Sequence, residues 1–478
     1  MRQHLKWIPI LIIAGCQQSL SPEAAQHITS MESEIVLSRV FDGAAGPSLA
    51  ERMEQLDVPA LSIAVFENGE ISWAKAYGLA DVDSERAATT ETLFQAASIS
   101  KPVAAVAMHA MAEEGLLDLD TDVNDLLTSW QLPESEFNTE EPVTLRRIVN
   151  HTAGLTVWGF PGYHRDSTLA TTVGVLAGLG NTDAIRVYKE PGESWQYSGG
   201  GYTLMQLLLA DVADQAFPDI VSERVLERAG MEHGGYTQPL PDSIHDQAAT
   251  GYRTSGDAVE GNWHVYPEMA AAGLWTTPSD LARFAIAVQA DLTGAEVLLT
   301  SESTEAMLTG GMNGHGLGPS ISPDSLRFGH GGANEGFRCQ FTAFKDGRGG
   351  IAVMTNSDNG GVLAQEILLT VAREYGWPGL EPDSITTTKL SAEQFADLEG
   401  LYVFTNPNDP TDVDNVTAVE RDGMLVLSTP EDGDFATLTA TSALDFIELT
   451  GPNTARFEMD GETVAALHWS ERARGVRQ

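Results

Sequence analysis

The apolar residues of this chain alternate with polar ones in some segments and recur every three or four positions in others. Leu61–Phe66 and Ile71–Tyr77 form two strand-like runs on either side of Asn68-Gly69. That dipeptide is typical of a two-residue hairpin turn, because both of its positions need a positive φ angle. Two further strands, around a glycine-rich turn, are predicted at Arg338–Phe344 and Gly350–Asn356.

Between these strands the pattern favours helices. Lys101–Glu114 is apolar on almost every side and stops at Gly115, as expected of a helix that is buried in a core. Apolar residues also recur with helical spacing from Met205 and again from Leu281. A last helix is predicted over Val362–Tyr375, directly before a glycine.

Strands at both ends of a helical middle predict an α/β (α+β) fold. We expect an antiparallel sheet flanked by helices over residues 31–378, with a helical subdomain inserted between its terminal strands. Further on, short β-rich runs alternate with Asp-, Gly- and Pro-rich turns, which predicts a small all-β domain over residues 390–478. Its clearest strands are expected at Met424–Ser428, Phe446–Leu449, Ala455–Phe457 and Val464–His468.

The chain is strongly acidic, with 68 Asp and Glu against 27 Lys and Arg in 478 residues and a formal net charge of −41. Nucleic acids and anionic lipid surfaces repel such a chain, so we exclude sequence-independent binding to DNA or RNA. The 2 cysteines cannot form a disulfide framework, and none of the 11 histidines has metal-ligand spacing to another. We therefore expect no metal site of the histidine type and no cofactor.

The first residues have the pattern of an export signal. Arg2 and Lys6 precede the apolar run 7–14, which is too short to cross a bilayer but suits the core of a signal peptide. The signal peptide is expected to occupy residues 1–15.

The apolar run ends in Ile13-Ala14-Gly15-Cys16, which resembles a bacterial lipobox. The resemblance implies cleavage before Cys16 and a lipid anchor on this residue, followed by a tether over residues 16–30. Gln17, in place of an aspartate, implies the outer membrane, with the protein facing the periplasm. An ordinary secretory signal with an accidental cysteine is the alternative.

Ser98 and Lys101 are three positions apart at the start of the predicted buried helix, so their side chains share one face. A serine hydroxyl attacks poorly until a base removes its proton, and a lysine is that base only where burial or neighbouring cations keep it neutral. The same spacing at Ser72 and Lys75 falls on a predicted strand, where the two side chains point to opposite faces. Ser98 and Lys101 are therefore the candidate nucleophile and base.

Two glycine-rich segments carry further candidates. Tyr197 stands just before three glycines and the Met205 helix, so its phenol can reach into a cleft; a tyrosine packed at a helix entry is the alternative. His330 lies in the Gly-His-Gly-Gly-Ala-Asn segment 329–334, ahead of the strand at Arg338. Its glycines let backbone N–H groups approach a substrate oxygen closely, although a simple glycine turn has the same composition.

In this order and spacing, the three segments resemble the motifs of the serine β-lactamase and penicillin-binding-protein clan, in particular its class C-like esterases and D-aminopeptidases. The resemblance covers about residues 61–375. It implies that Ser98 attacks, that Lys101 and Tyr197 move protons, and that backbone N–H groups bind the oxyanion. The expected catalytic residues are Ser98, Lys101 and Tyr197, and the expected substrate or oxyanion residues are His330, Gly331, Gly332 and Ala333.

Two positions depart from the pattern of the clan. Gly199 stands where the clan has an asparagine, and His330 stands where β-lactamases have a lysine. Without an amide and a permanent positive charge, the cleft offers less to the amide and carboxylate of a penicillin. His151 lies in a segment typical of the clan, and we interpret it as a hydrogen-bonded structural histidine rather than a catalytic one.

The sequence thus predicts an exported serine hydrolase that forms an acyl-enzyme with a carboxylic ester or a D-amino-acid peptide or amide. A β-lactamase or D-Ala-D-Ala carboxypeptidase is the alternative within the same clan. A catalytically silent lipoprotein that binds peptidoglycan is the alternative from another class. A small-molecule substrate and a membrane, the latter reached through Cys16, are the expected partners, and the sequence does not indicate an oligomeric state.

Overall fold

The computed structural model describes residues 20–42, 45–406, 409–431, 433–449, 453–470 and 473–478. The chain divides into two compact units. We call Met1–Val36 with Gly46–Glu381 the sheet unit, and Leu37–Ala45 with Pro382–Gln478 the barrel unit. The predicted signal peptide and Cys16 lie outside the described residues.

The sheet unit is built on a seven-stranded antiparallel sheet, in the order β4-β3-β2-β12-β11-β10-β9. The predicted hairpin is confirmed: Asn68 and Gly69 turn between β2 and β3 with φ angles of 51° and 81°. The strands are β2 (Ala60–Glu67), β3 (Glu70–Asp81), β4 (Arg86–Ala87), β9 (Ser320–Ile321), β10 (Arg327–Asn334), β11 (Phe337–Phe344) and β12 (Gly350–Thr355).

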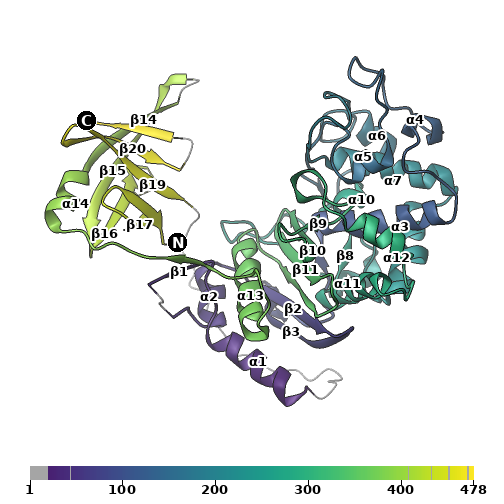
Figure 1. Cartoon of the computed structure of the whole chain (residues 1–478), viewed down its shortest axis with the longest axis horizontal. Helices are drawn as coiled ribbons and strands as arrows, with labels where there is room; N and C mark the ends of the chain where they lie inside the picture. Colours follow the sequence, from purple (N-terminus) through teal and green to yellow (C-terminus); the bar gives the residue numbers. More distant parts are fainter. Residues whose placement is uncertain (1–19, 43–44, 407–408, 432, 450–452, 471–472) are drawn as a thin grey trace. The chain divides into compact units, whose positions relative to one another are not determined.

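Both faces of this sheet are covered. Alternate residues of β2, such as Ile63 and Val65, face a core shared with α1 (Pro22–Ser33), α2 (Leu49–Gln55) and α13 (Gly360–Tyr375), while Ala64 and Phe66 face the larger core. Figure 1 shows α13 lying along the sheet on the side of α1. The nearly continuous apolar sequence of β2 follows from burial on both faces, since each face of a strand receives every second residue.

The larger core belongs to the helical region between β4 and β9, where the sequence predicts an inserted helical subdomain. Within it, α10 packs against both α3 and α7 (Figure 1). The helices are α3 (Ser100–Glu113), α4 (Val123–Leu126), α5 (Leu145–Val149), α6 (Thr172–Leu176), α7 (Gly199–Ala213), α8 (Phe217–Val221), α9 (Glu227–Ala229) and α10 (Met269–Ala272), followed by α11 (Pro278–Leu292) and α12 (Ser301–Met307).

The structure corrects the predicted tether. Helix α1 begins at Pro22, inside the stretch 16–30 that the sequence analysis treats as a tether. Ala24, Ile28 and Met31 are buried, because their spacing places them on one face of the helix, which packs against α13. Within the described residues, the chain therefore joins the folded unit almost at once.

The segment 329–334 is also different from the simple turn considered above. It forms most of β10, paired with β11 on one side and, at Phe328 and Gly329, with β9 on the other. A Cβ atom at Gly329 would lie 2.2 Å from the carbonyl oxygen of Phe341, so glycine permits this close strand pairing. The glycines thus serve a strand rather than a loop.

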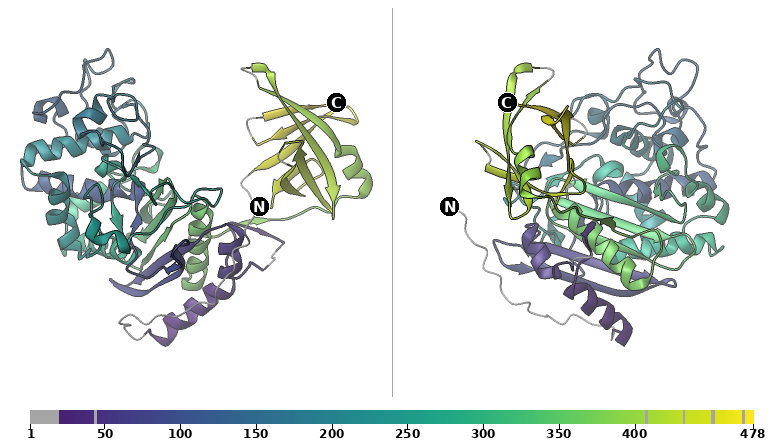
Figure 2. Two further views of the ribbon diagram at one scale, coloured as in Figure 1. Left: turned by 180° about the vertical axis from the view of Figure 1, so that it is seen from behind. Right: turned by 60° about the vertical axis from the view of Figure 1, so that its left-hand side comes forward.

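The barrel unit is a closed antiparallel barrel of eight strands in sequence order, β14 to β21 (Figure 2). Its interior is filled by apolar side chains, among them Tyr402, Phe446 and Phe457. A short helix, α14 (Ala392–Leu398), and a parallel pair formed by β1 (Arg39–Phe41) and β13 (Asp383–Ile385) complete it. The strands are β14 (Gly400–Asn406), β15 (Asp409–Arg421), β16 (Met424–Thr429), β17 (Gly433–Ala440), β18 (Asp445–Glu448), β19 (Thr454–Asp460), β20 (Thr463–Trp469) and β21 (Ala473–Arg477).

A helix that crosses a bilayer needs about 20 largely apolar residues. In the part of the chain that the structure describes, no helix is both long and apolar enough to cross a bilayer.

Candidate active site

Ser98 lies in a single 3-10 turn, Ala97–Ile99, that leads directly into α3. The preceding residue, Ala97, has a φ of 49°, a left-handed conformation that is rare for residues other than glycine, asparagine and aspartate. Such conformations persist where the surrounding structure imposes them, and they cluster at functional sites. The turn leaves Ser98 partly exposed at the mouth of a helix that is otherwise buried.

The structure brings Lys101 beside Ser98. The Lys101 Nζ lies 3.2 Å from Ser98 Oγ and donates a second hydrogen bond of 2.8 Å to the carbonyl oxygen of Ala271, at the end of α10. The lysine is only 2% exposed, and no carboxylate of the described residues forms an ion pair with it. The burial that a lysine base requires is therefore present.

Tyr197 reaches the same place from the N-terminal end of α7. The Lys101 Nζ lies 4.9 Å from the centre of its ring. The backbone around Tyr197 is held by Ser198, whose hydroxyl accepts from the N–H of Gly201 and donates to the carbonyl oxygen of Thr156. This N-cap fixes the start of α7 and with it the position of the tyrosine.

Two histidines flank Tyr197 with opposite hydrogen-bonding character. The His330 Nδ1 lies 2.5 Å from the carbonyl oxygen of Gly331 and must carry the proton, so its Nε2 is left as an acceptor. The His151 Nδ1 accepts from the N–H of Ser198 at 3.2 Å, so its Nε2 carries the proton. Neither Nε2 has a hydrogen-bond partner, although both are buried. The hydrogen bond from Ser198 agrees with the structural role expected for His151.

A third histidine, His315, completes this cluster, and the sequence analysis missed it. Its ring stacks on Trp195 at 5.3 Å and lies 6.3 Å from the ring of Tyr197. It lies in a poorly patterned segment between α12 and β9, with no neighbouring motif that could have indicated it. Only the tertiary fold brings it to the site.

All three histidines are kept neutral by their surroundings. Burial, and next the positive charge of Lys101, lowers the pKa of His330 to about 3 and that of His315 to about 4. Burial likewise lowers the pKa of His151 well below its usual value, with His315, Lys101 and His330 adding to the effect. The site thus holds neutral imidazoles around the lysine at ordinary pH.

Strand β10 brings the remaining predicted residues next to the Ser98 turn. A Cβ at Gly332 would lie 2.2 Å from the carbonyl oxygen of Ala96, so the strand touches the backbone two residues before Ser98. The thiol of Cys339, on the neighbouring strand β11, donates to the same carbonyl at 3.1 Å. Gly331 and Ala333 are exposed along this edge, where their backbone can meet a substrate.

The position of Gly199 has a physical explanation. A Cβ there would lie 3.0 Å from Cε2 of Phe160 and 3.1 Å from the carbonyl oxygen of Trp158. The space in which the clan has an asparagine side chain is therefore bordered by an aromatic ring. Trp158 itself is 69% exposed, and its ring lies 5.6 Å from that of Tyr197.

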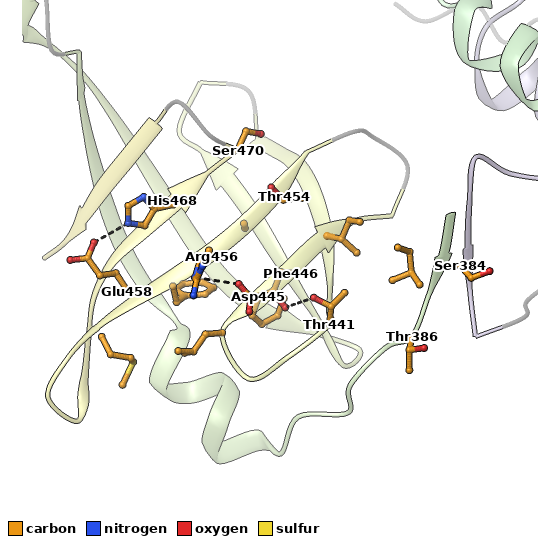
Figure 3. Close-up of a pocket in the computed structure, with 16 residues that line it drawn as sticks. Ser384, Thr386, Thr441, Asp445, Phe446, Thr454, Arg456, Glu458, His468 and Ser470 are labelled. Carbon is orange, nitrogen blue, oxygen red and sulfur yellow. Dashed lines mark hydrogen bonds and ion pairs between the residues drawn. The ribbon is translucent and has the colours of Figure 1, made fainter. Parts of the chain in front are cut away.

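The described residues contain no group of three or more His, Cys, Asp or Glu side chains that could hold a metal ion. A hollow of about 1070 Å³ does lie on the barrel unit, lined by β13, by β18 to β20 and by residues next to these strands (Figure 3). Its charged groups already have partners: His468 lies 2.9 Å from Glu458, and Arg456 lies 3.4 Å from Asp445. The groups around Ser98 are the better candidates for chemistry, because several of them lack partners.

The chain is similar to known proteins over most of the sheet unit. Residues 48–373 match the family model described as Beta-lactamase. Penicillin-binding protein 4* of Bacillus subtilis (strain 168) is 26% identical over 323 residues, which cover 63% of this chain and 69% of that protein.

Two solved structures share the fold at lower identity. The octameric penicillin-binding protein homologue from Pyrococcus abyssi superposes with a TM-score of 0.62 at 21% identity, covering 90% of this chain and 98% of that one. The D-amino acid amidase from Ochrobactrum anthropi SV3 superposes with a TM-score of 0.56 at 20% identity, covering 68% and 95%. Because the family model spans most of the sheet unit, including the Ser98, Tyr197 and His330 segments, this chain belongs to the Beta-lactamase family and is a serine hydrolase of the β-lactamase and penicillin-binding-protein clan.

Proposed function

We propose that this protein hydrolyses carboxylic esters and D-amino-acid amides or peptides through an acyl-enzyme on Ser98. The observation that carries the proposal is the contact of 3.2 Å between Ser98 Oγ and the buried Lys101 Nζ, which in turn lies against the ring of Tyr197. A hydroxyl, a buried amine and a phenol at one point provide a nucleophile and two groups that can carry its proton.

The reaction begins when Ser98 Oγ attacks the substrate carbonyl and its proton passes to Lys101, the group that it contacts. The backbone N–H groups of Ser98 and Ala333 stabilise the oxyanion. Lys101 and Tyr197 then return a proton to the departing alcohol or amine. Water attacks the acyl-enzyme by the same route in reverse, which releases the acid and restores the Ser98 hydroxyl.

The choice of substrate rests on what surrounds this centre. His330 is neutral, so a substrate carboxylate finds no charged partner there, and Gly199 offers no amide. A charge-assisted hydrogen bond contributes about 1.5–3 kcal/mol, so its loss weakens binding of a penicillin by roughly one to two orders of magnitude. The D-amino acid amidase named above, which shares the fold, supports amides as a second substrate class.

The test begins with covalent labelling of the purified full chain by a fluorophosphonate probe. We expect the probe on Ser98, and we expect Ser98→Ala to abolish both labelling and hydrolysis of p-nitrophenyl acetate. Ser72→Ala is the matched control, because Ser72 has the same spacing to a lysine but lies on β3. Labelling that survives in Ser98→Ala would contradict the proposal.

Substrate preference is tested separately, by comparing kcat/KM for p-nitrophenyl acetate, a D-amino-acid amide and nitrocefin. If nitrocefin were turned over faster than the ester and the amide, the proposed substrate preference would be wrong and β-lactams would be the preferred substrates. The assignment of Ser98 as the nucleophile would not be affected. A correctly folded wild type that neither labels nor turns over any of the three would favour a silent binding protein.

The location of the protein is a further part of this proposal, supported by the lipobox-like sequence before Cys16. Export to the periplasm and a lipid on Cys16 would hold the enzyme at the outer membrane, with its site facing the periplasm. Labelled palmitate should be incorporated into wild type and into Cys339→Ser, but not into Cys16→Ser. Recovery of the wild type in the soluble fraction would contradict the anchor.

A further inference from the structure

The segment Thr156–Phe160 is held rigidly beside Tyr197. The N–H groups of Gly199 and Gly200 donate to the carbonyl oxygens of Trp158 and Val157, each at 3.0 Å. These bonds join the segment to the first turn of α7, the same turn that positions Tyr197.

The backbone of this segment is strained at one point. Val157 has a φ of 62°, which is a genuine outlier for a β-branched residue. Strain of this kind is kept only where the surroundings impose it. The next residue, Trp158, is exposed.

Trp158 is unusually exposed for a tryptophan. Its side chain is 69% exposed, whereas most tryptophans are largely buried, and its ring lies 5.6 Å from that of Tyr197 at an interplanar angle of 48°. Phe160, two residues after Trp158 in the same segment, is half-buried, and its ring borders the position of Gly199. We call Trp158, Phe160 and Tyr197 the aromatic wall: the rings of Trp158 and Tyr197 lie together, and Phe160 borders the position of Gly199, which has no side chain. The wall lies near the candidate nucleophile because Tyr197 lies against Lys101, which contacts Ser98.

We propose that this aromatic wall binds the acyl group of the substrate and selects acyl groups that carry a planar apolar ring. The inference rests on the proposed function and extends it to specificity, with Trp158 as the residue that contributes most of the selection. The wall carries no charged side chain, and an exposed indole next to the reacting groups has a face on which a ring can stack. Stacking of this kind, together with burial of the indole face, favours the aryl substrate by roughly tenfold.

The test compares two esters with the same leaving group, p-nitrophenyl acetate and p-nitrophenyl phenylacetate. In Trp158→Ala we expect kcat/KM for the phenylacetate to fall by about 5- to 30-fold, mainly through KM, while that for the acetate changes by less than about twofold. Trp158→Phe should keep most of the preference, because it keeps a ring. Leu116→Ala is the control, since Leu116 is an exposed apolar residue beyond the far end of α3 and should change neither ester.

A second measurement does not depend on turnover. Benzylboronic and methylboronic acid both add to a serine hydroxyl, and calorimetry should show tighter binding of the benzyl compound to wild type but not to Trp158→Ala. An equal loss for both esters in Trp158→Ala, or no loss for either, would overturn the proposal, as would equal binding of both boronic acids to wild type. Acetate hydrolysis that disappears in Ser98→Ala would meanwhile keep the proposed function intact, so the two failures are distinguishable.

Discussion

Several buried polar atoms around Tyr197 lack hydrogen-bond partners, whereas those in the described part of the barrel unit have them. In the site, Nε2 of His151, Nδ1 of His315 and Nε2 of His330 are buried without a hydrogen-bond partner. In the barrel, the Tyr402 hydroxyl donates to the carbonyl oxygen of Leu398 at 2.6 Å. Among the described residues of the barrel unit, no buried side-chain nitrogen or oxygen lacks a partner.

Buried polar groups therefore have different roles in the two regions. An unpartnered buried donor or acceptor costs about 1–3 kcal/mol, so a fold that needs only stability pairs such groups, as the barrel does. A site that must bind and transform a polar substrate keeps them free, because the substrate supplies the missing partner. Changes at the site should therefore reduce activity more than stability, and changes at paired groups should do the reverse.

The largest expected effect comes from Lys101→Met. Removing the group that moves the proton of Ser98 should lower kcat/KM for p-nitrophenyl acetate by about 10²- to 10⁴-fold, the range typical of a general base. The midpoint of urea denaturation should stay the same or rise, because an apolar chain replaces a buried amine. Lys75→Met, which removes an ion pair between Lys75 on β3 and Glu32 on α1, is the control and should keep its activity. If Lys101→Met lowered the stability but kept its specific activity, the expected difference between the site and the barrel unit would be wrong.

The next effect concerns a paired group in the sheet unit. Arg52, 6% exposed, donates two hydrogen bonds of 2.7 and 2.8 Å to Glu366. Glu366→Ala leaves the guanidinium buried and unpaired, so the free energy of unfolding should fall by about 3–5 kcal/mol, with kcat of the folded fraction unchanged. Replacing both residues by methionine should restore most of the stability. A loss below about 1 kcal/mol in the single variant would show that water reaches the pair.

The pH dependence of stability tests the neutral histidines. The pKa of His315 is lowered to about 4, so between that value and 6.5 the unfolded chain binds a proton that the folded chain does not, and stability rises with pH. At about 1.4 kcal/mol per pKa unit, this contributes on the order of 3 kcal/mol. His315→Gln should reduce this rise between pH 4 and 6.5 by the share of one proton, while His151 and His330, whose pKa values are also lowered, keep their shares. A wild type whose stability is constant over that range would contradict the lowered pKa.

The smallest effect, confined to higher pH, comes from Glu268 beside α10. It is fully buried, both carboxyl oxygens lack partners, and burial raises its pKa to about 7. Because the folded chain holds this proton to a higher pH than the unfolded chain, stability falls as pH rises from about 4.5 to 7. Glu268→Gln should remove that fall and raise the unfolding free energy by up to about 3 kcal/mol above pH 7. No difference between the variant and wild type at pH 8 would mean that Glu268 has a partner in solution.

The sequence analysis predicts local features well and distant ones poorly. The hairpin at Asn68-Gly69 and the buried helix that begins near Lys101 depend on neighbouring residues, and both are confirmed. His315 reaches Tyr197, and Phe160 reaches Gly199, only through the packing of separate segments, which no local pattern encodes. The glycines around His330 were ambiguous for the same reason, because the strand they form depends on its partners β9 and β11.

The contact of Gly332 with Ala96 determines how this site can vary. At this contact the two main chains touch directly. No space for a side chain remains between strand β10 and the turn that holds Ser98. Any larger residue at position 332 would push the two apart and move the Ala333 N–H away from Ser98. Side chains such as Trp158 stand outside this contact. In the proposed mechanism, exchange of single side chains such as Trp158 can therefore change which acyl group is accepted, while the spacing between the proposed nucleophile and the proposed oxyanion donor stays the same.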